Sequence, residues 1–471
     1  MTQPSQREEA ADDAAVLPFP TAARRDADPR GPATPIELEG WGRHPRVMAV
    51  AADSDDLRRA SRDAVLSRGL GRAYSDAALP PEGSTRRVVL TPRADRILAF
   101  DEATGILRAE AGLSLSTMRN LFLSRGLFTP VSTGTRHVTL GGMVASDVHG
   151  KNHHVAGCFG RHVRALLIRT GDGRVLEATP TQHADLFYAV QGGMGLIGHI
   201  LEVELALERL PSPWIYEESE RLGSLSAVID ALREASATWP MTVAWVDTSA
   251  RGGKAGRGIV MRGRWATPDE APKQPPRVKG AIGLPFGLPS GLVGPTTIGL
   301  MNTLWYTRHG ARPRKHIVHP ESFYWPLDGI GAWNRAYGPR GFTQYQCVLP
   351  DAQLYGELLD IFRKRGGSSF VTVFKDCGEQ GQGPLSFPKK GTTLAIDIPL
   401  HRLEAVRALC HALNAFVVAN DGRIYLAKDA FTTAQDFAKM YPRLPEFLEA
   451  RRKYDPDGRI DSAQAHRLGI R

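Results

Sequence analysis

The sequence predicts a mixed α+β protein with two domains, and three observations lead to that expectation. The chain has 471 residues, which is enough for more than one hydrophobic core. Its hydrophobic content of 42% and charged content of 23% are ordinary for a globular protein. Short apolar runs that suit strands alternate with amphipathic stretches that suit helices, and no tandem repeat is present.

The elements of the first half are predicted mainly as strands. A Gly171-Asp172-Gly173 turn between two apolar runs predicts a β-hairpin. Helical spacing of apolar residues predicts helices over 113–126 and 183–193. The predicted strands are RVVL (87–90), ILAFD (97–101), ILRAEAG (106–112), ALLIRT (165–170), RVLEAT (174–179) and ILEVELAL (200–207).

The second half begins with a change of character at 208–214 (ERLPSPW), which is a plausible domain boundary. An amphipathic helix is predicted over 224–239 and another over 405–422, with strands at 344–350 and 393–400. A second boundary is expected near residue 421.

The N-terminal residues and the cysteines together indicate a reducing compartment. Residues 1–39 carry no periodic apolar pattern and no apolar signal-peptide core, so we expect a disordered leader. Four scattered cysteines form no CxxC pair, which argues against a zinc site and against a disulfide framework. We therefore expect free thiols and a cytoplasmic protein, with peripheral membrane association as an option.

The net charge of +9 is concentrated in one region. Residues 251–316 contain twelve Lys or Arg and two acids, and within them 280–307 has no charged residue, three prolines and six glycines. A continuous membrane-spanning helix is unlikely with that many breakers. Two interpretations stay open. One is a mobile apolar loop (270–305) that rests on an anionic membrane or covers a greasy phosphorylated substrate. The other is a buried connector within the second domain.

Three glycine-rich segments carry the chemistry: GLGRAYSD (69–76), placed after a predicted helix; residues 132–163; and QGGMGLIGHI (191–200). Small residues let backbone N–H groups approach a polyphosphate, so together they indicate a large phosphate-bearing cofactor. The first segment lacks the spacing of a dinucleotide-binding Rossmann turn. A metal site in the HGKNHH run (149–154) is disfavoured, because Lys151 would repel a cation and only Asp147 sits at ligand spacing.

The order of these motifs resembles the FAD-binding (PCMH-type) domain of the vanillyl-alcohol oxidase superfamily. Within it the chain is most similar to the decaprenylphosphoryl-β-D-ribose 2′-oxidase family, the flavin half of a ribose-to-arabinose epimerase. The similarity covers the chain from Gly40 on and is carried by these motifs in the same order: GLGRAYSD, TGTRHVTLGG, HGKNHH, GGMGLIG, AWVD, FYWPLD, WNRAYGP, QYQ, VFK, PLSFP, GRIYLAKD and MYP.

The resemblance implies an FAD domain built from 40–209 and a C-terminal segment 421–471. A substrate domain at 210–420 lays an antiparallel sheet over a non-covalent FAD. The implied catalytic residues are Lys428, which accepts or orients the substrate hydroxyl proton, with Tyr74 and His149. The implied substrate-binding residues are Lys151, Trp245, Tyr324, Gln346, Lys375 and Thr393, with Tyr324 and Trp245 alternatively simple core aromatics. The implied cofactor-binding residues are Gly69, Gly71, Arg72, Ala73, Tyr74, Ser75, Gly134, Thr135, Thr139, Leu140, Gly141, Gly142, Ser146, Asp147, Val148, His149, Ile200, Tyr425 and Lys428.

The resemblance further implies a phosphorylated or lipid-linked sugar substrate, a partner reductase that uses NAD(P)H, and neither metal nor nucleic acid. The chain departs from the mycobacterial pattern at Ala395, where those members have a cysteine facing the flavin, at Thr393 in place of an asparagine, and in GRAYSD for GRSYGD. The main alternative is a sugar-alcohol or aldonolactone oxidase of the same superfamily. A non-enzymatic basic protein is disfavoured, because the surplus charge flanks an apolar run rather than exposed aromatics.

Overall fold

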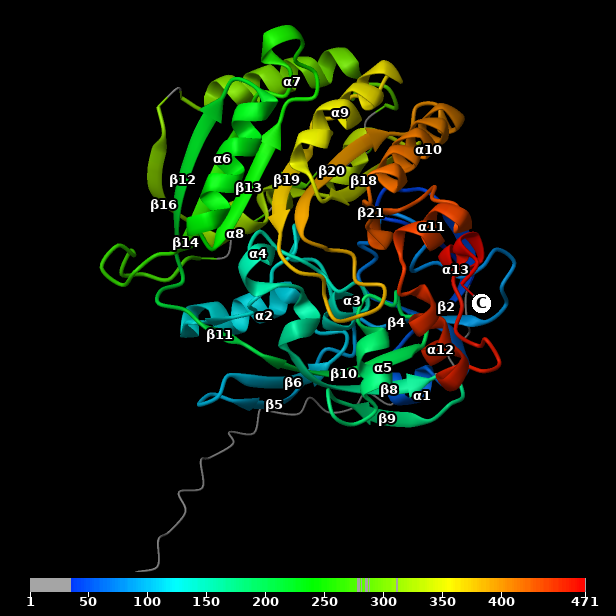
Figure 1. Ribbon diagram of the computed structural model, residues 1–471. Helices are drawn as coiled ribbons and strands as arrows, with labels where there is room; N and C mark the ends of the chain where they lie inside the picture. The colour runs from blue at the N-terminus through cyan, green and yellow to red at the C-terminus, as the bar shows by residue number, and fades with distance from the viewer. Residues whose placement is uncertain are drawn as a thin grey trace, which may run out of the picture.

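The computed structural model of the chain describes residues 35–277, 280, 282–283, 287, 289–310 and 312–470. Its helices and sheets form a lower domain with a four-stranded and a five-stranded sheet and an upper domain with an eight-stranded sheet (Figure 1). The two-domain α+β class expected from the sequence is confirmed.

The four-stranded sheet of the lower domain has the order β1-β2-β4-β3. The strand β1 runs antiparallel to β2, whereas β2 and β3 both pair in parallel with β4. Its strands are β1 (Pro35–Glu39), β2 (Arg46–Asp53), β3 (Ala64–Arg68) and β4 (Arg87–Leu90). Residues 35–39, which were expected to belong to the leader, form β1 and pair with β2.

The five-stranded sheet has the order β5-β6-β10-β8-β9, and all its pairings are antiparallel. The hairpin predicted around the Gly171-Asp172-Gly173 turn is present as β8 and β9. The strands are β5 (Ile97–Asp101), β6 (Ile106–Glu110), β8 (Val163–Thr170), β9 (Val175–Ala178) and β10 (Gly198–Ala206).

Two helices of the lower domain, α2 and α5, lie within the predicted ranges 113–126 and 183–193, whereas α3 and α4 form within the 132–163 segment, where no helix was predicted. The Ser114 hydroxyl accepts a hydrogen bond from the Thr117 N–H at the start of α2, and Gly126 ends the following turn with φ +72°. The helices here are α1 (Leu57–Ala60), α2 (Leu115–Phe122), α3 (Leu140–Ala145), α4 (His153–Ala156) and α5 (Ala184–Val190).

The eight-stranded sheet of the upper domain is antiparallel throughout, with the order β16-β12-β14-β13-β19-β20-β18-β21. Its strands are β12 (Ile215–Leu222), β13 (Met241–Val246), β14 (Gly258–Trp265), β16 (Arg314–Val318), β18 (Phe342–Leu349), β19 (Thr372–Cys377), β20 (Gly391–Pro399) and β21 (Arg423–Ile424).

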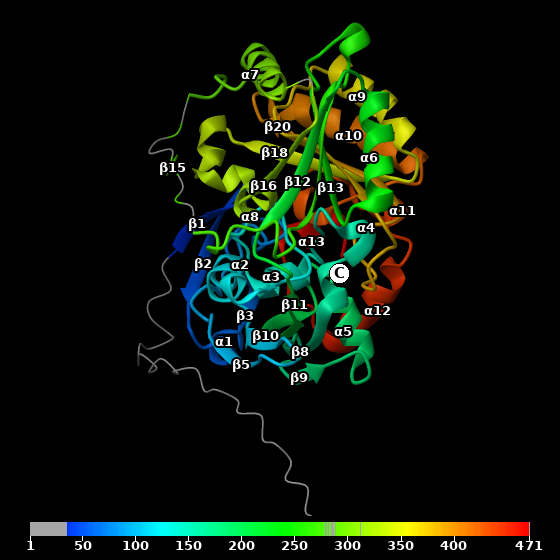
Figure 2. The same cartoon turned by 90° about the vertical axis from the view of Figure 1, so that its left-hand side faces the viewer.

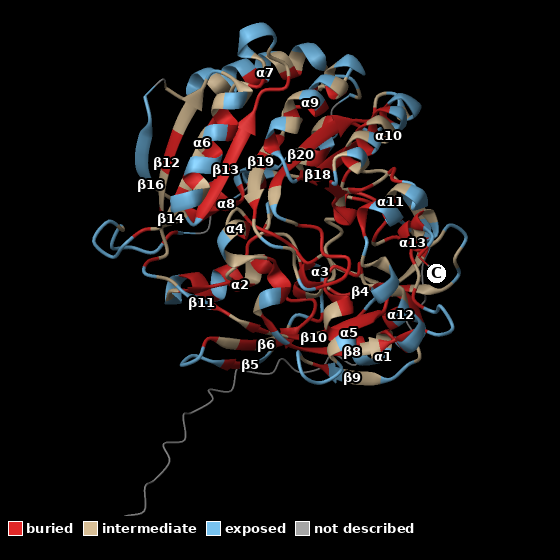
Figure 3. Ribbon diagram, in the orientation of Figure 1, coloured by how far each residue is buried: buried red, intermediate tan, exposed pale blue. Residues whose placement is uncertain are grey.

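Three amphipathic helices cover one face of this sheet: α6 (Leu225–Thr238), α9 (Tyr355–Lys364) and α10 (Leu403–Ala419). Figure 2 places them on one side of the sheet and α7 (Pro295–Arg308) and α8 (Pro320–Tyr324) on the other. The apolar face of the strands packs under the three helices, as the buried Phe374, Leu394 and Ile396 illustrate (Figure 3).

The last segment of the chain forms α11 (Ala434–Met440), which packs against α10 and β21 of the upper domain, and then returns to the lower domain as α12 (Leu444–Tyr454) and α13 (Ala463–Leu468). Helix α12 packs against α5, and the Ala463 N–H donates to the Leu79 carbonyl over 2.9 Å. Short strands complete the fold: β7 (Leu127–Phe128) pairs with β11 (Glu208–Arg209), and β15 (Ile282–Gly283) pairs with β17 (Ile330–Gly331).

Two expectations about local structure were wrong. The GLGRAYSD segment follows strand β3 rather than a helix, because AVLSR packs in the four-stranded sheet. In the apolar region, residues 295–308 form helix α7 rather than a loop. Pro295 suits the first helical position, and the Thr297 hydroxyl accepts a hydrogen bond from the Gly294 N–H over 2.9 Å. In the part of the chain that the structure describes, no helix is long and apolar enough to cross a membrane.

Candidate active site

One face of the eight-stranded sheet carries polar side chains, because alternate residues of a strand point to the same side. Gln346 lies opposite Ala395, Lys375 opposite Thr393, and Gln344 opposite Asp397 in the strand register. These six residues share the face that is not covered by α6, α9 and α10. Ala395 and Lys375 are only partly buried, so this face borders open space.

The glycine-rich segments come together at the same place. A Cβ on Gly69 would lie 2.4 Å from the Thr139 hydroxyl, so the first and second segments are in contact. Thr139 in turn begins helix α3, where its hydroxyl accepts from the Gly142 N–H over 3.3 Å. The second segment is held from the upper domain, since the Asp328 carboxylate accepts from the Thr135 hydroxyl (2.8 Å) and the Arg136 N–H (2.7 Å).

The Lys428 ammonium lies over the ring of Tyr74, although the two residues are far apart in the sequence. The Lys428 Nζ is 3.7 Å from the centroid of the Tyr74 ring. The Tyr74 N–H donates to the Ala427 carbonyl over 2.9 Å, which holds the two segments side by side. Burial lowers the pKa of Lys428, with Lys375 acting in the same direction and the Asp397 carboxylate opposing it. A lysine in such surroundings can act as a base near neutral pH.

A buried network next to Lys428 was not anticipated from the sequence. Asp397 is fully buried, accepts a hydrogen bond from the Gln344 amide, and accepts another from the Tyr337 hydroxyl at 3.4 Å. Gln344 also hydrogen-bonds to the Tyr74 side chain. Burial raises the pKa of Asp397, and Lys428 is among the groups that oppose this shift. The signal was the period of two in TLAIDIPL, which places Asp397 on the same face as Thr393.

Arg467 joins the segments that carry Tyr74 and Lys428. Its guanidinium contacts the Asp76 and Asp429 carboxylates, each at 2.8 Å. The contact with Asp76 is bidentate and the contact with the Asp429 carboxylate uses one nitrogen. Asp76 ends the GRAYSD motif and Asp429 follows Lys428 directly, so Arg467 fixes the distance between the segments that carry Tyr74 and Lys428.

Basic side chains gather beside Lys428 and the polar sheet face, and we call this region the pocket. Burial lowers the pKa of Lys151 to about 7, with Glu217 opposing the shift and Lys375 adding to it. Burial also lowers the pKa of Lys375 and of His149. The Lys151 ammonium donates to the Phe323 carbonyl and lies 4.3 Å from the Phe323 ring centroid. The mutual repulsion of these groups means that an anion would bind favourably among them.

His149 faces the same pocket through its ring. Its Nε2 lies 2.9 Å from the Gln346 amide nitrogen, and Gln346 also donates to the Thr393 hydroxyl over 3.2 Å. With Nε2 as the acceptor, the neutral ring carries its proton on Nδ1, a buried atom without a protein partner. The ring packs against Tyr425 at 5.0 Å, and the Tyr425 hydroxyl donates to the Ser146 carbonyl over 3.0 Å.

Three of the expected site residues direct their polar atoms to the protein itself. The Asp147 carboxylate accepts from the Gly160 N–H at 2.9 Å and from the Ser386 hydroxyl. The Trp245 indole donates to the Phe370 carbonyl at 2.8 Å, and the Tyr324 hydroxyl to the Met241 sulfur at 2.8 Å. Leu140 and Val148 are buried apolar residues, and Ile200 lies within β10. These side chains support the pocket from behind.

The histidines of the HGKNHH run do not converge. His153 Nε2 contacts the Cys158 sulfur at 3.2 Å, and its Nδ1 accepts from the Gly378 N–H at 3.1 Å. His154 Nε2 lies 2.8 Å from the Trp239 carbonyl. Among the described residues, no group of three or more His, Cys, Asp or Glu side chains is arranged to hold a metal ion.

The pocket has the features that an FAD site requires. Ser75 carries a buried hydroxyl without a protein partner, in the segment that also holds Arg72. Gly71 has φ +64°, which leaves its N–H free to turn toward an anion, and a Cβ on Gly134 would meet nothing within 4 Å. Arg72 itself stacks 3.8 Å above the Trp41 ring. Unpaired donors, small residues and a partly exposed sheet face suit a cofactor with a pyrophosphate and a flat ring.

Comparison with known proteins agrees with this geometry. Residues 45–179 match the family described as "FAD binding domain" and residues 352–468 match "D-arabinono-1,4-lactone oxidase". The chain is 37% identical to decaprenylphosphoryl-beta-D-ribose oxidase of Mycolicibacterium smegmatis, over 93% of this chain and 98% of the relative. It is 31% identical to an uncharacterized Streptomyces coelicolor protein over 76% of this chain and 100% of that one.

A more distant relative is the L-gulonolactone oxidase of Mus musculus, 31% identical over 24% of this chain and 26% of the relative. The near-complete match with the mycobacterial oxidase extends through both domains. The chain is therefore an FAD-dependent oxidoreductase that belongs to the decaprenylphosphoryl-β-D-ribose oxidase family.

Proposed function

We propose that this protein oxidises the 2′-hydroxyl of a prenylphosphoryl ribose, or of a similar phosphorylated pentofuranose, to a ketone. The observation that carries the proposal is the buried Lys428, whose pKa is lowered by burial and whose Nζ faces the Tyr74 ring at 3.7 Å. Around it lie the polar sheet face, the glycine-rich segments and the basic groups described above.

In this proposal Lys428 begins neutral and accepts the proton of the sugar hydroxyl at its Nζ. The resulting ammonium is stabilised by the Tyr74 ring, through a cation–π contact, and by the Asp397 carboxylate. Bound FAD supplies the two-electron acceptor for the carbinol hydrogen. Gln346 and His149 line the pocket beside these groups and orient the sugar, together with Thr393.

Lys151 and Lys375 form a clamp for the substrate phosphate. Burial lowers the pKa of each, and Lys375 also contributes to the lowering of the Lys151 and Lys428 pKa values. A phosphate placed between them would relieve that repulsion and stabilise both ammonium forms. A free lactone or polyol offers no such charge, so this clamp favours a phosphorylated substrate over the lactones that the more distant relatives act on.

The cofactor is proposed to be held without a covalent bond. His149, the first residue of the HGKNHH run in the second glycine-rich segment, has its Nε2 within hydrogen-bonding distance of the Gln346 amide. The FAD domain is proposed to combine 40–209 with 421–471, and the substrate domain to comprise 210–420. The contacts of α12 with α5 and of Ala463 with Leu79 support this division.

The product is a 2-keto sugar. We propose that an NAD(P)H-dependent reductase reduces it on the opposite face, which completes an epimerisation to arabinose. Because the substrate carries a prenyl chain, peripheral contact with a membrane is part of the proposal. The four cysteines are buried free thiols, which supports the cytoplasmic face.

The proposal is tested by anaerobic mixing of the FAD-loaded protein with a prenylphosphoryl ribose while the flavin absorption is followed. The wild-type flavin should bleach, and a Lys428→Ala variant should stay yellow, since it retains the cofactor and lacks the base. Bleaching of that variant at the wild-type rate would refute the role of Lys428. Bleaching by an aldonolactone but not by the phosphorylated ribose would support the alternative substrate.

A further inference from the structure

Helix α7 has an outward face that is apolar. It lies at the end of the upper domain farthest from the lower domain in both views (Figures 1 and 2). Most of its surface is exposed (Figure 3). Leu300 and Leu304 are 62% and 60% exposed, and Met301 and Trp305 are 42% and 36% exposed. With 3.6 residues per turn, these four residues lie on one side of the helix.

The opposite side of α7 fixes the helix to the domain. Ile298 and Asn302 are buried, and the Asn302 amide donates to the Asp247 carboxylate at 2.8 Å and to the Ser369 carbonyl at 3.1 Å. One turn further on, the Tyr306 hydroxyl donates to the Leu222 carbonyl at 3.2 Å. Polar anchors at a spacing of four residues therefore set the rotation of the helix, and this rotation turns the leucines outward.

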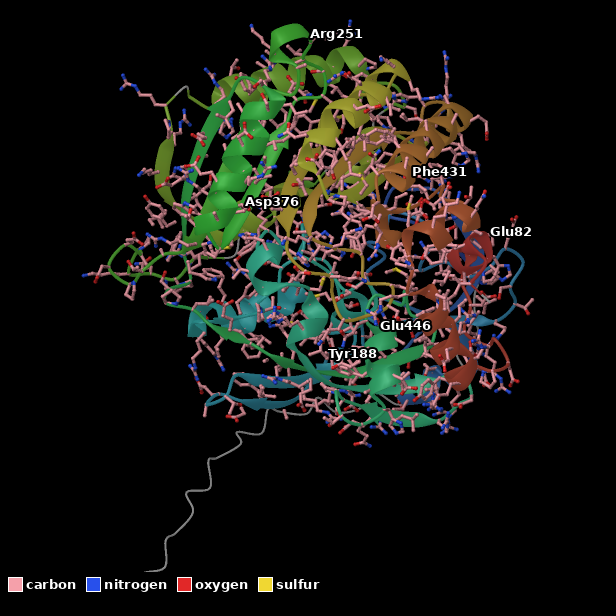
Figure 4. The ribbon with its side chains drawn as sticks, viewed as in Figure 1. Glu82, Tyr188, Arg251, Asp376, Phe431 and Glu446 are labelled. Atoms are coloured by element: carbon pink, nitrogen blue, oxygen red, sulfur yellow. The ribbon has the colours of Figure 1, made fainter. Side chains whose placement is uncertain are left out.

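Positive charge surrounds the apolar face. From residue 271 to 316 the sequence contains no Asp or Glu. Arg308 and Arg312 are exposed at the C-terminal end of the helix, and Arg251 and Lys254 are exposed in a turn at the same end of the molecule, where Figure 4 labels Arg251. An apolar stripe with cationic surroundings is the pattern of a helix that lies in the surface of an anionic membrane.

The residues before α7 connect it to the candidate active site. Val293 packs with the aromatic cluster of Tyr74, Tyr337 and Phe342, and its carbonyl lies 2.9 Å from His401 Nε2. The chain thus runs from the cluster beside the catalytic tyrosine to the exposed helix within a few residues. A substrate whose prenyl chain stays in a bilayer would reach the pocket most directly if this end of the protein faced that bilayer.

We propose that α7 docks the protein on an anionic lipid bilayer, with Leu300, Leu304 and Trp305 inserted among the headgroups and the neighbouring arginines on lipid phosphates. A second copy of the chain is a poorer occupant. In a twofold dimer through α7, self-complementarity would bring the cationic surroundings of one copy against those of the other. The proposal rests on the proposed function only for the reason why the protein would approach a membrane. Lipid binding itself can be measured without turnover.

The experiment is co-sedimentation of the FAD-loaded protein with phosphatidylglycerol–phosphatidylcholine vesicles and with phosphatidylcholine vesicles. We expect binding to the anionic vesicles that weakens as salt is raised, and weaker binding to the neutral ones. A Leu300→Ser/Leu304→Ser variant should lose about tenfold or more in partition coefficient, from the loss of two inserted side chains. The control is Leu98→Ser, which removes a leucine that is 45% exposed on β5 of the lower domain.

A second readout reports the site of contact. Quenching of tryptophan fluorescence by vesicles with brominated acyl chains should fall in a Trp305→Phe variant, since that indole is placed in the headgroup layer. Equal sedimentation of the leucine variant and the wild type would overturn the proposal. So would a concentration-dependent dimer that the leucine variant abolishes. If the vesicle results hold while prenylphosphoryl ribose fails to bleach the flavin, only the proposed reaction is refuted.

Discussion

Replacing Asp397 with asparagine tests how the pocket sets the protonation of Lys428. The substitution keeps the shape of the side chain and a carbonyl oxygen that can accept from Gln344, and it removes the negative charge. The Asp397 carboxylate favours the charged form of Lys428 and so opposes the lowering of the Lys428 pKa by burial. Without it, the pKa of Lys428 should fall further.

The size of the shift follows from the interaction of opposite charges at close range. A neighbouring countercharge within a few ångströms typically moves a pKa by about 1–3 units. Because a base must be neutral to accept a proton, the reaction gains rate as the pH rises through the pKa of Lys428. The acid limb of the rate profile in Asp397→Asn should therefore move to lower pH by about 1–3 units, while the plateau falls because the ammonium product loses its countercharge.

The assay is anaerobic stopped-flow bleaching of the flavin by substrate across a pH series, which isolates the oxidation half-reaction. The matched control is Asp376→Asn on β19, a carboxylate on the other face of the same sheet that accepts from the Thr392 hydroxyl at 2.7 Å (labelled in Figure 4). Its profile should coincide with that of the wild type. An acid limb that stays in place in Asp397→Asn, or that moves to higher pH, would refute the base assignment for Lys428.

Three further substitutions probe the cofactor site, the phosphate clamp and the domain contact. Gly134→Val should lower FAD occupancy by about tenfold or more, because the added side chain would occupy the proposed cofactor site. The apoprotein should melt normally, because a Cβ on Gly134 meets no protein atom within 4 Å. The control is Gly356→Ala, where a Cβ also meets nothing within 4 Å. Lys151→Met should stabilise the FAD-loaded protein against urea at pH 7 or below, with about 5 kcal/mol as the upper limit set by the pKa shift. Since burial lowers the folded-state pKa from 10.5 to about 7, this gain should fade as the pH rises toward 10.5, and a pH-independent gain would contradict the cause. Glu321→Gln removes the carboxylate that contacts the guanidinium groups of Arg119 and Arg136, and it should lower the free energy of unfolding by about 3–5 kcal/mol in the same assay. A loss below about 1 kcal/mol would show that the Glu321 carboxylate is dispensable for stability.

The elements with a clear hydrophobic period could be predicted from the sequence. The helices α6 and α10 and the hairpin of β8 and β9 appear where the spacing of apolar residues and the turn glycines place them. Helix α7 could not be predicted in this way, because Gly299 lies within it and because prolines and glycines interrupt the apolar run that precedes it. Its stability comes from tertiary contacts, chiefly Asn302 with Asp247, and those partners are far away in the sequence.

The residues of the candidate site could likewise be predicted only in part. Lys428, Tyr74 and His149 stood out by motif, and their neighbours in the motif follow from it. Asp397 was hidden within an apolar strand, and its importance depends on the register that sets it opposite Gln344. A single sequence gives the face of a strand but not its partner strand. The residues missed are therefore those whose function depends on pairing across the sheet.

In the proposed mechanism, the same burial that suits Lys428 to act as a base suits Lys151 and Lys375 to hold a phosphate. Each lysine loses hydration in the pocket, and its pKa falls. A lysine beside a carboxylate can hold a proton once it has received one, which suits the group next to Asp397. The charged forms of Lys151 and Lys375 would be stabilised when an anion arrives, although Glu217 already opposes the shift at Lys151, and this suits a phosphate site. In the proposed mechanism, the Asp397 carboxylate on β20 stabilises the ammonium form of Lys428 after proton transfer, whereas Lys151 and Lys375 hold the substrate phosphate.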